Sequence, residues 1–206
     1  MPLMLSAIVV CAITLTFIDP TLEPHVREFK LTPSQVGVLF LLLAAANSLL
    51  APVVGWLVDK HRIHRQFMII GAFCAAISVA IVGPSPLLPF LQKTVYSVAV
   101  GMALMGMSIS MFFIPTFQAI LSEATGHGFT DNRATYAIAS GLFQATFSFG
   151  GFFGPTFGSI VTKNIGFPWT TTLLCSFHVI LGCCLLTYTY FIRDRRGRQA
   201  TNEMAM

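Results

Sequence analysis

Charged residues are scarce in this sequence. Asp, Glu, Lys and Arg together make up 10% of its 206 residues, whereas 55% are hydrophobic and the mean hydropathy is +0.76. A soluble domain carries about 25% charged residues, so the composition excludes a soluble enzyme and indicates an integral membrane protein. The net charge of +4 comes from Lys and Arg at the ends of apolar segments. Because no basic patch is interleaved with aromatics, we expect no nucleic acid as a partner.

Motifs for metals, cofactors and catalysis are also missing. The five cysteines fall inside apolar runs, and no CxxC or Cys/His pair has the spacing of metal ligands. Buried packing residues are the interpretation favoured for such cysteines. The sequence shows no nucleophile–base pair for a membrane hydrolase, and no ring of charges or filter-like loop for a pore. We therefore expect a protein that is not an enzyme, with no cofactor and no metal.

What the sequence does contain is a series of apolar segments, and the predicted fold class is an all-α membrane protein. The predicted transmembrane helices are 3–29, 34–58, 67–83, 94–121, 133–161 and 169–192, followed by a basic tail, 193–206, which we expect to be disordered. Lys and Arg are distributed unequally between the connections. One side would carry Lys60, Arg62, Arg65, Arg133, Arg193, Arg195, Arg196 and Arg198, and the other Arg27, Lys30, Lys93 and Lys163. The richer side faces the cytoplasm as a rule, which places both termini there.

The fifth of these segments holds a stripe of glycines. Gly150, Gly154 and Gly158 recur every four residues, so on a helix they form one smooth face that a second helix can approach closely. Pro155 removes a helical hydrogen bond and is expected to kink the segment. A kinked membrane helix with a smooth face is typical of a moving part, which favours a transporter.

The connection between the second and third segments carries a charged motif. Gly55 lies near the helix end, and Asp59 is followed by Lys60 and Arg62. An acid followed by bases can hold two helix ends together by ion pairs in one conformation and release them in another. A charged connection can also simply be a solvated topology signal, and the sequence leaves both interpretations open.

This motif resembles the signature between the second and third helices of each six-helix half of the major facilitator superfamily. It differs at Arg62, where the family pattern has glycine. The stretch from Gly150 to Gly158 resembles the glycine-proline motif in the fifth helix of antiporter halves. The resemblance implies that the chain is one half of a major facilitator transporter.

A more specific resemblance is to the second half of the vesicular amine transporters, over essentially the whole chain. It is carried by Phe17-Ile18-Asp19-Pro20-Thr21-Leu22, Tyr136-Ala137-Ile138-Ala139, Gly154-Pro155 and Ile165-Gly166-Phe167-Pro168-Trp169. That family exchanges lumenal protons for cytosolic amines, so the resemblance implies a vesicle membrane, an organic cation and protons as partners, and a role for the acid Asp19. Ser140 stands where monoamine and acetylcholine carriers have Asp. These differences from the monoamine and acetylcholine carriers are most similar to the vesicular polyamine branch of the family.

Asp19 is the one acid well inside an apolar stretch, where a carboxylate costs about 2.5–3.5 kcal/mol to insert. Such a group is retained when it pairs with a proton or an amine, although a cap near the membrane surface is the alternative. Glu23 lies one turn away and can share the cation. The neutral polar residues Gln118 and Gln144, together with Ser140, are further candidates. The two glutamines can equally be packing contacts between helices.

The sequence therefore predicts half of a proton-coupled organic-cation antiporter that works by alternating access. Transport would require an N-terminal six-helix half or a second copy of the chain, with substrate bound between the halves. The alternative is a non-transporting truncated isoform that associates with full-length transporters and regulates them.

Overall fold

The computed structural model describes residues 2–61, 63–86, 93–126, 128–130 and 132–204, with only the backbone described for 191–204. The helices in these ranges are α1 Pro2–Val26, η1 Arg27–Phe29 (a short 3-10 helix), α2 Pro33–His61, α3 His64–Val82, α4 Val95–Gly126, α5 Arg133–Ile165 and α6 Phe167–Met204. No strand occurs in the described ranges. The structure confirms the predicted all-α fold.

Several helices extend beyond the apolar runs that predicted them. α4 continues to Gly126 and α5 to Ile165, because a polar or charged residue ends an apolar run without ending a helix. α5 begins where the Asn132 side chain accepts a hydrogen bond from the Thr135 backbone N–H at 3.0 Å, which caps the helix. It ends at Ile165, and the next residue, Gly166, has a φ of +84°, which favours glycine.

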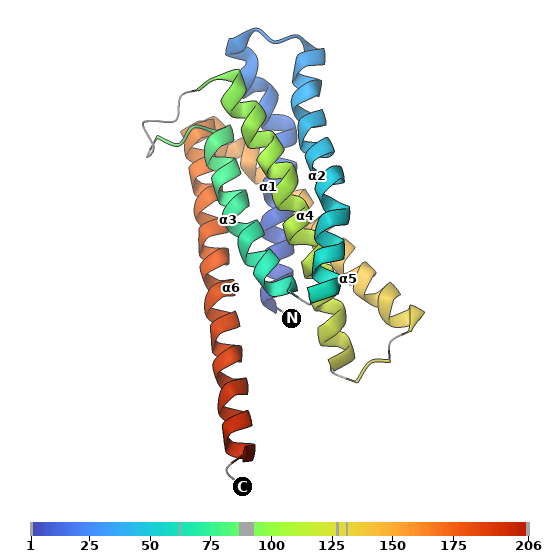
Figure 1. Ribbon diagram of the computed structural model, residues 1–206. Coiled ribbons are helices and arrows are strands. Elements are labelled where there is room, and N and C mark those ends of the chain that lie inside the picture. The colour runs from blue at the N-terminus through green and yellow to red at the C-terminus, as the bar shows by residue number, and fades with distance from the viewer. Residues whose placement is uncertain (1, 62, 87–92, 127, 131, 205–206) are drawn as a thin grey trace.

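The predicted disordered tail is wrong, because α6 continues through residues 193–204 to Met204. The segment contains no proline and holds four arginines together with Gln199, Ala200, Glu203 and Met204, which are all good helix formers. Hydrophobicity alone therefore located the apolar part of α6 and missed its polar continuation, which projects beyond the bundle (Figure 1).

Both termini lie at the same end of the bundle, which we call the terminal end (Figure 1). The α2–α3 and α4–α5 connections are also at the terminal end, whereas the α1–α2, α3–α4 and α5–α6 connections lie at the opposite end. Successive connections therefore lie at alternating ends, as the predicted division of Lys and Arg between two sides assumes.

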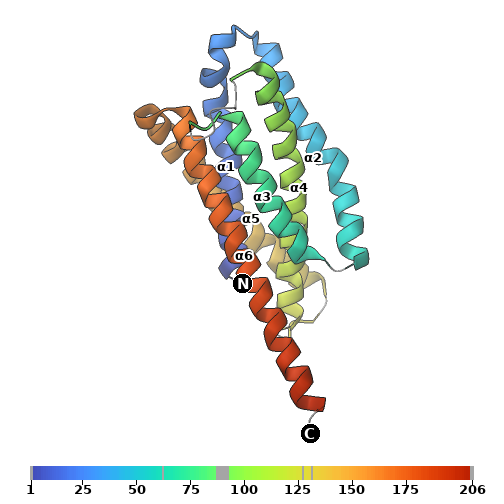
Figure 2. The same ribbon diagram turned by 60° about the vertical axis from the view of Figure 1, so that its left-hand side comes forward.

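Two helix pairs and a linking helix organise the packing. α1 packs against α5, α2 packs against α4, and α3 lies between α4 and α6, as the rotated view in Figure 2 also shows. One core cluster, around Phe17, Val82, Met102 and Phe167, lies toward the opposite end. A second, which includes Ile8, lies toward the terminal end. α2 is the helix least covered by the rest of the chain, with 11% of its most apolar stretch buried.

Among the described residues, five helices are long and apolar enough to cross a membrane: α1 (with η1), α2, α3, α4 and α6. The sequence predicted six crossings, and the helix missing from these five is α5, which is less apolar than the others. It has 33 residues, which is long enough, but serines, threonines and Gln144 interrupt its apolar residues. α5 nevertheless runs from the terminal end to the opposite end alongside α1.

Candidate functional site

The acidic residues predicted to bind a cation lie on one uncovered face of α1. Asp19 and Glu23 are both exposed, one helical turn apart, and each is followed by an exposed proline, Pro20 or Pro24. Residues four apart on a helix are neighbours on its surface, so the structure brings the two carboxylates together as expected. Both lie in the part of α1 nearer the opposite end, on its exposed side and outside the bundle's own core.

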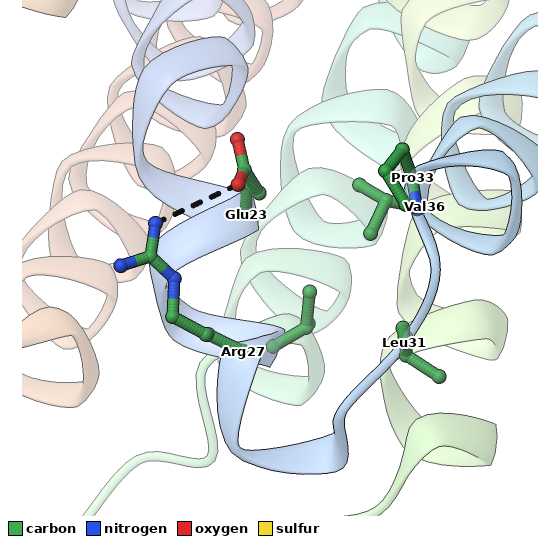
Figure 3. Close-up of a pocket in the computed structure, with 6 residues that line it drawn as sticks. Glu23, Arg27, Leu31, Pro33 and Val36 are labelled. Carbon is green, nitrogen blue, oxygen red and sulfur yellow. Dashed lines mark ion pairs between the residues drawn. The ribbon is translucent and has the colours of Figure 1, made fainter.

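Glu23 already faces a cationic group. Its Oε1 lies 3.6 Å from Nη2 of Arg27, and the Glu23 and Arg27 side chains are 67% and 76% exposed. Figure 3 shows this pair on one wall of a cleft of about 290 Å³, with Leu31, Pro33 and Val36 on the other wall. The cleft joins the end of α1 to the start of α2 and leaves the carboxylate open to a second cation.

Ser140 and Gln144 lie far from these acids. Both are exposed on α5 toward the terminal end, and the Gln144 Nε2 donates to Ser148 Oγ at 3.4 Å. Gly154 of α5 packs beside Ile13–Thr16 of α1. From this contact, Gln144 lies ten residues toward the terminal end, and Asp19 lies about five residues toward the opposite end. At 1.5 Å per residue the separation along the helices is roughly 20 Å. The structure does not join the two groups into one site.

The glycine stripe of α5 is the surface against which α1 packs. A Cβ atom built on Gly150 would lie 2.7 Å from the carbonyl oxygen of Val9, and one on Gly154 would lie 2.6 Å from that of Ile13 and overlap the Thr16 hydroxyl. At Gly158 it would overlap the ring of Phe17. The structure thus identifies α1 as the closely approaching neighbour, and the pairing shows that α1 and α5 run parallel. Pro155 follows the tightest of these contacts, inside a continuous helix.

At the terminal end, Asp59 contacts a different partner from the one expected. Gln118 Nε2 on α4 donates a hydrogen bond to Asp59 Oδ1 at 2.5 Å, and Asp59 forms no ion pair with any described base. The Lys60 ammonium lies 4.6 Å from the centre of the Trp56 ring, a cation–π contact. A Cβ on Gly55 would meet nothing within 4 Å, so no close approach requires a glycine there. Arg62 lies outside the described residues.

The Asp59–Gln118 pair borders a polar cleft of about 470 Å³ between α2, α3, α4 and α5. Sequence reasoning assigned Gln118 to cation binding, whereas the structure places it here with the charged motif, away from Asp19. The cleft also includes residues that sequence reasoning did not select as site residues: His64, Ser122, Thr125 and Tyr136. Tyr136 was visible in the Tyr-Ala-Ile-Ala motif, but nothing in the sequence pairs α4 with α2.

Buried polar contacts cross the bundle at two further points. His178 on α6 is fully buried, and its Nε2 lies 2.9 Å from Thr14 Oγ1 on α1. Ser110 on α4 donates to the Asn47 carbonyl oxygen at 2.9 Å and lies 2.6 Å from Asn47 Oδ1 on α2. These contacts hold helices together in an apolar surrounding. In the described part of the chain, no three His, Cys, Asp or Glu residues cluster as metal ligands would.

Comparison with known proteins gives one consistent answer. A family model described as Major Facilitator Superfamily matches residues 4–205. The chain is 31% identical to the MFS-type transporter SLC18B1 of Rattus norvegicus over 186 residues, covering 89% of this chain and 40% of the rat protein. It is 32% identical to the Mus musculus protein of that name over 193 residues, covering 91% of this chain and 42% of the relative. For the Homo sapiens protein the values are 32% over 190 residues, 91% and 41%. The chain thus spans about two fifths of the length of these relatives.

Proposed function

Because the chain belongs to the major facilitator superfamily, we propose that it is one six-helix half of a secondary transporter that exchanges organic cations for protons. The similarity to the SLC18B1 transporters agrees with the amine-transporter motifs around Asp19, Tyr136 and Gly154. Polyamines or related amines are the proposed cargo, and alternating access is the proposed mechanism.

The observation that carries this proposal is the acidic stripe of Asp19 and Glu23. Both carboxylates lie on the uncovered face of α1, and Glu23 already holds the Arg27 guanidinium beside an open cleft. A carboxylate binds an ammonium by the same charge-assisted hydrogen bonds that it offers a guanidinium. In this proposal a proton and an amine compete for the Asp19 carboxylate.

A second six-helix body would complete the substrate site. Substrates of this superfamily bind between two halves near the midplane of the membrane, and an acid exposed on α1 can line such a cavity only if another body closes it. α2 supports this proposal, because Leu41 and Leu49 on its surface are 62% and 76% exposed. The partner is an N-terminal half or a second copy of this chain, embedded with it in the bilayer.

Two contacts supply the proposed conformational change. The glycine stripe lets α1 and α5 slide or rock as closely packed backbones, with Pro155 as the local weak point. At the terminal end, the Asp59–Gln118 hydrogen bond ties α2 to α4 and can break when the cleft there opens. Gly55, Lys60 and Arg62 belong to this gating segment in the proposal.

We further propose that the terminal end faces the cytoplasm, since the connections there are richer in Lys and Arg. Asp19 and Glu23 then lie toward the lumen of a secretory or other cytoplasmic vesicle. In the proposed exchange a lumenal proton replaces the amine at Asp19, which is the direction required for accumulation.

The proposal is tested by spermidine uptake into acidified vesicles that contain a full-length transporter with this half. Asp19→Asn should reduce proton-driven uptake at least about tenfold, because a hydrogen bond to a charged group is worth roughly 1.5–3 kcal/mol. The matched control is Glu28→Gln, since Glu28 is also an exposed acid at the opposite end but pairs with Lys93. Equal uptake by wild type and Asp19→Asn would remove Asp19 from the mechanism.

The chain alone should be reconstituted in parallel. Uptake by the chain alone would indicate transport by a homodimer. Association with a full-length transporter, without uptake by the chain itself, would favour the alternative of a regulatory half.

A further inference from the structure

Two prolines weaken α1 at the level of its acids. Pro20 and Pro24 both lie inside the helix. Because proline has no N–H, neither residue can donate the hydrogen bond that an α-helix makes to the carbonyl group four positions earlier. Asp19 directly precedes the first proline and Glu23 lies between the two. The spacing of the two carboxylates therefore depends on a segment in which the helix has lost part of its own support.

One ring on α6 contacts α1 on both sides of this weak segment. Phe167 stacks on Phe17 with ring centroids 5.7 Å apart, and on His25 with centroids 3.9 Å apart. Phe17 precedes both prolines and His25 follows both. All three side chains are buried. Aromatic pairs stabilise a contact beyond the area that they bury, so Phe167 connects two parts of α1 that the helix itself joins weakly.

Phe167 is held in place by contacts of its own helix. It is the first residue of α6, and one turn later the Thr171 Oγ1 lies 3.1 Å from the carbonyl oxygen of Gly83, just beyond α3. The next hydroxyl, Thr172 Oγ1, lies 2.9 Å from Ser85 Oγ. These polar contacts fix the start of α6 to the end of α3. The stack on α1 thus has a firm side on α6 and a weaker side on the proline segment.

The contacts of His25 indicate what its ring contributes. A backbone hydrogen bond joins His25 to Val82 at the end of α3. The other ring nitrogen, Nε2, is buried and has no hydrogen-bond partner in the described part of the chain. Leaving a buried polar atom unpaired costs free energy, and the close stack on Phe167 offsets part of that cost. The flat ring is therefore the main contribution of His25 at this point of the bundle.

We propose that Phe167 and His25 clamp the proline segment of α1 and act as positioning residues for cation binding. By holding that segment, they keep a fixed spacing between Asp19 and Glu23. This inference rests on the proposed cation transport. Two carboxylates at a fixed spacing favour a cation with two positive charges over a cation with one, because both charges are paired without any further ordering of α1.

The clamp itself is tested without transport, by hydrogen exchange of the chain reconstituted in lipid. His25→Leu removes the ring and His25→Phe keeps it, while both variants lose the hydrogen bond to Val82. Backbone amides of residues 18–26 should exchange about two- to tenfold faster in His25→Leu than in the unaltered chain, the effect expected for one aromatic pair. In His25→Phe they should exchange at nearly the unaltered rate.

Two further variants complete this comparison. Phe167→Leu removes the same stack from the side of α6 and should accelerate exchange of residues 18–26 as His25→Leu does. Phe112→Leu is the matched control, because Phe112 is a fully buried ring in the second core cluster. It should lower stability without a selective effect on residues 18–26. Circular dichroism of each variant checks folding, and Phe167→Leu replaces His25→Leu if the latter does not fold.

The positioning role is tested in a full-length transporter that contains this half. The competitors of spermidine uptake are butyltrimethylammonium, with one charge, and tetramethylenebis(trimethylammonium), with two. His25→Leu and Phe167→Leu should each raise the half-inhibitory concentration of the dication about two- to fivefold, the range for one exposed ion pair. That of the monocation should stay unchanged. His25→Phe and Phe112→Leu should leave the ratio of the two concentrations as it is in the unaltered transporter.

The outcomes separate this inference from the proposed function. Equal exchange of residues 18–26 in His25→Leu and His25→Phe would overturn the clamp. Faster exchange together with an unchanged ratio of the two competitors would overturn the positioning role alone, as long as Asp19→Asn still reduces uptake. Uptake that does not depend on Asp19 would overturn the proposed function, and the positioning role with it.

Discussion

Gln118 and Asp59, which are 59 residues apart in the chain, are joined by a hydrogen bond from the amide Nε2 to the carboxylate Oδ1 at 2.5 Å. The bond connects α4 to the end of α2 and borders a cleft that also includes Tyr136 of α5. Residues of α2, α3, α4 and α5 thus border one cleft at the terminal end.

Removing either member of this pair should have the same effect as removing both. Asp59→Ala and Gln118→Ala should each lower the stability of the detergent-solubilised protein, and the double-mutant cycle should show a coupling of about 0.2–1 kcal/mol, the range for exposed pairs. Melting temperatures of the four proteins measure this. Gln66→Ala, at an exposed position on α3, is the control, and strictly additive effects of the two changes would show that the contact contributes nothing.

Gly154→Leu should destabilise the α1–α5 contact by about 1–3 kcal/mol, the usual cost of overpacking, because even a Cβ atom there would lie 2.6 Å from the Ile13 carbonyl oxygen. Gly141→Leu on the same helix is the matched control, since a Cβ there meets nothing within 4 Å. The yield of monodisperse protein and its melting temperature are the readouts. A Gly154 variant as stable as the Gly141 variant would exclude close packing of α1 on the stripe.

Thr14→Val should destabilise the fold by about 1–2 kcal/mol. It leaves the fully buried His178 without its hydrogen bond to Thr14, and interhelical hydrogen bonds in membranes are worth roughly that much at most. Adding His178→Phe should restore part of the loss, because an apolar ring needs no partner. Thr156→Val is the control, since Thr156 is exposed and bonds only within α5. Further destabilisation by the second change would contradict this explanation.

α5 should cross the membrane although its composition is less apolar than that of the other helices. In a variant without the five native cysteines, Arg133→Cys and Lys163→Cys mark its two ends. A membrane-impermeant maleimide added to sealed vesicles should label one and spare the other until detergent is added. Lys60→Cys should behave like Arg133→Cys, because both positions lie at the terminal end. Equal labelling of the two α5 positions in sealed vesicles would mean that α5 does not span.

The sequence alone determined which segments are helices and that the fold is a membrane bundle, because both depend on local apolar runs and on breakers such as Gly166. Local spacing was also sufficient to place Asp19 and Glu23 on one face, and to find the small-residue stripe of Gly150, Gly154 and Gly158. The ends of α4, α5 and α6 were missed, since polar residues extend a helix as readily as they end an apolar run.

Only the tertiary structure decided which surfaces meet. The residues of an apolar helix do not identify the helix that packs against it. Nothing in the sequence therefore specified that the glycine stripe packs on α1 or that His178 contacts Thr14. The partner of Asp59 was decided in the same way: the bases next to it in sequence suggested an ion pair, but the fold brings Gln118 to its carboxylate. Parallel packing of α1 and α5 also separates Gln144 from Asp19, because residues on two helices share a level only where their packing register aligns them.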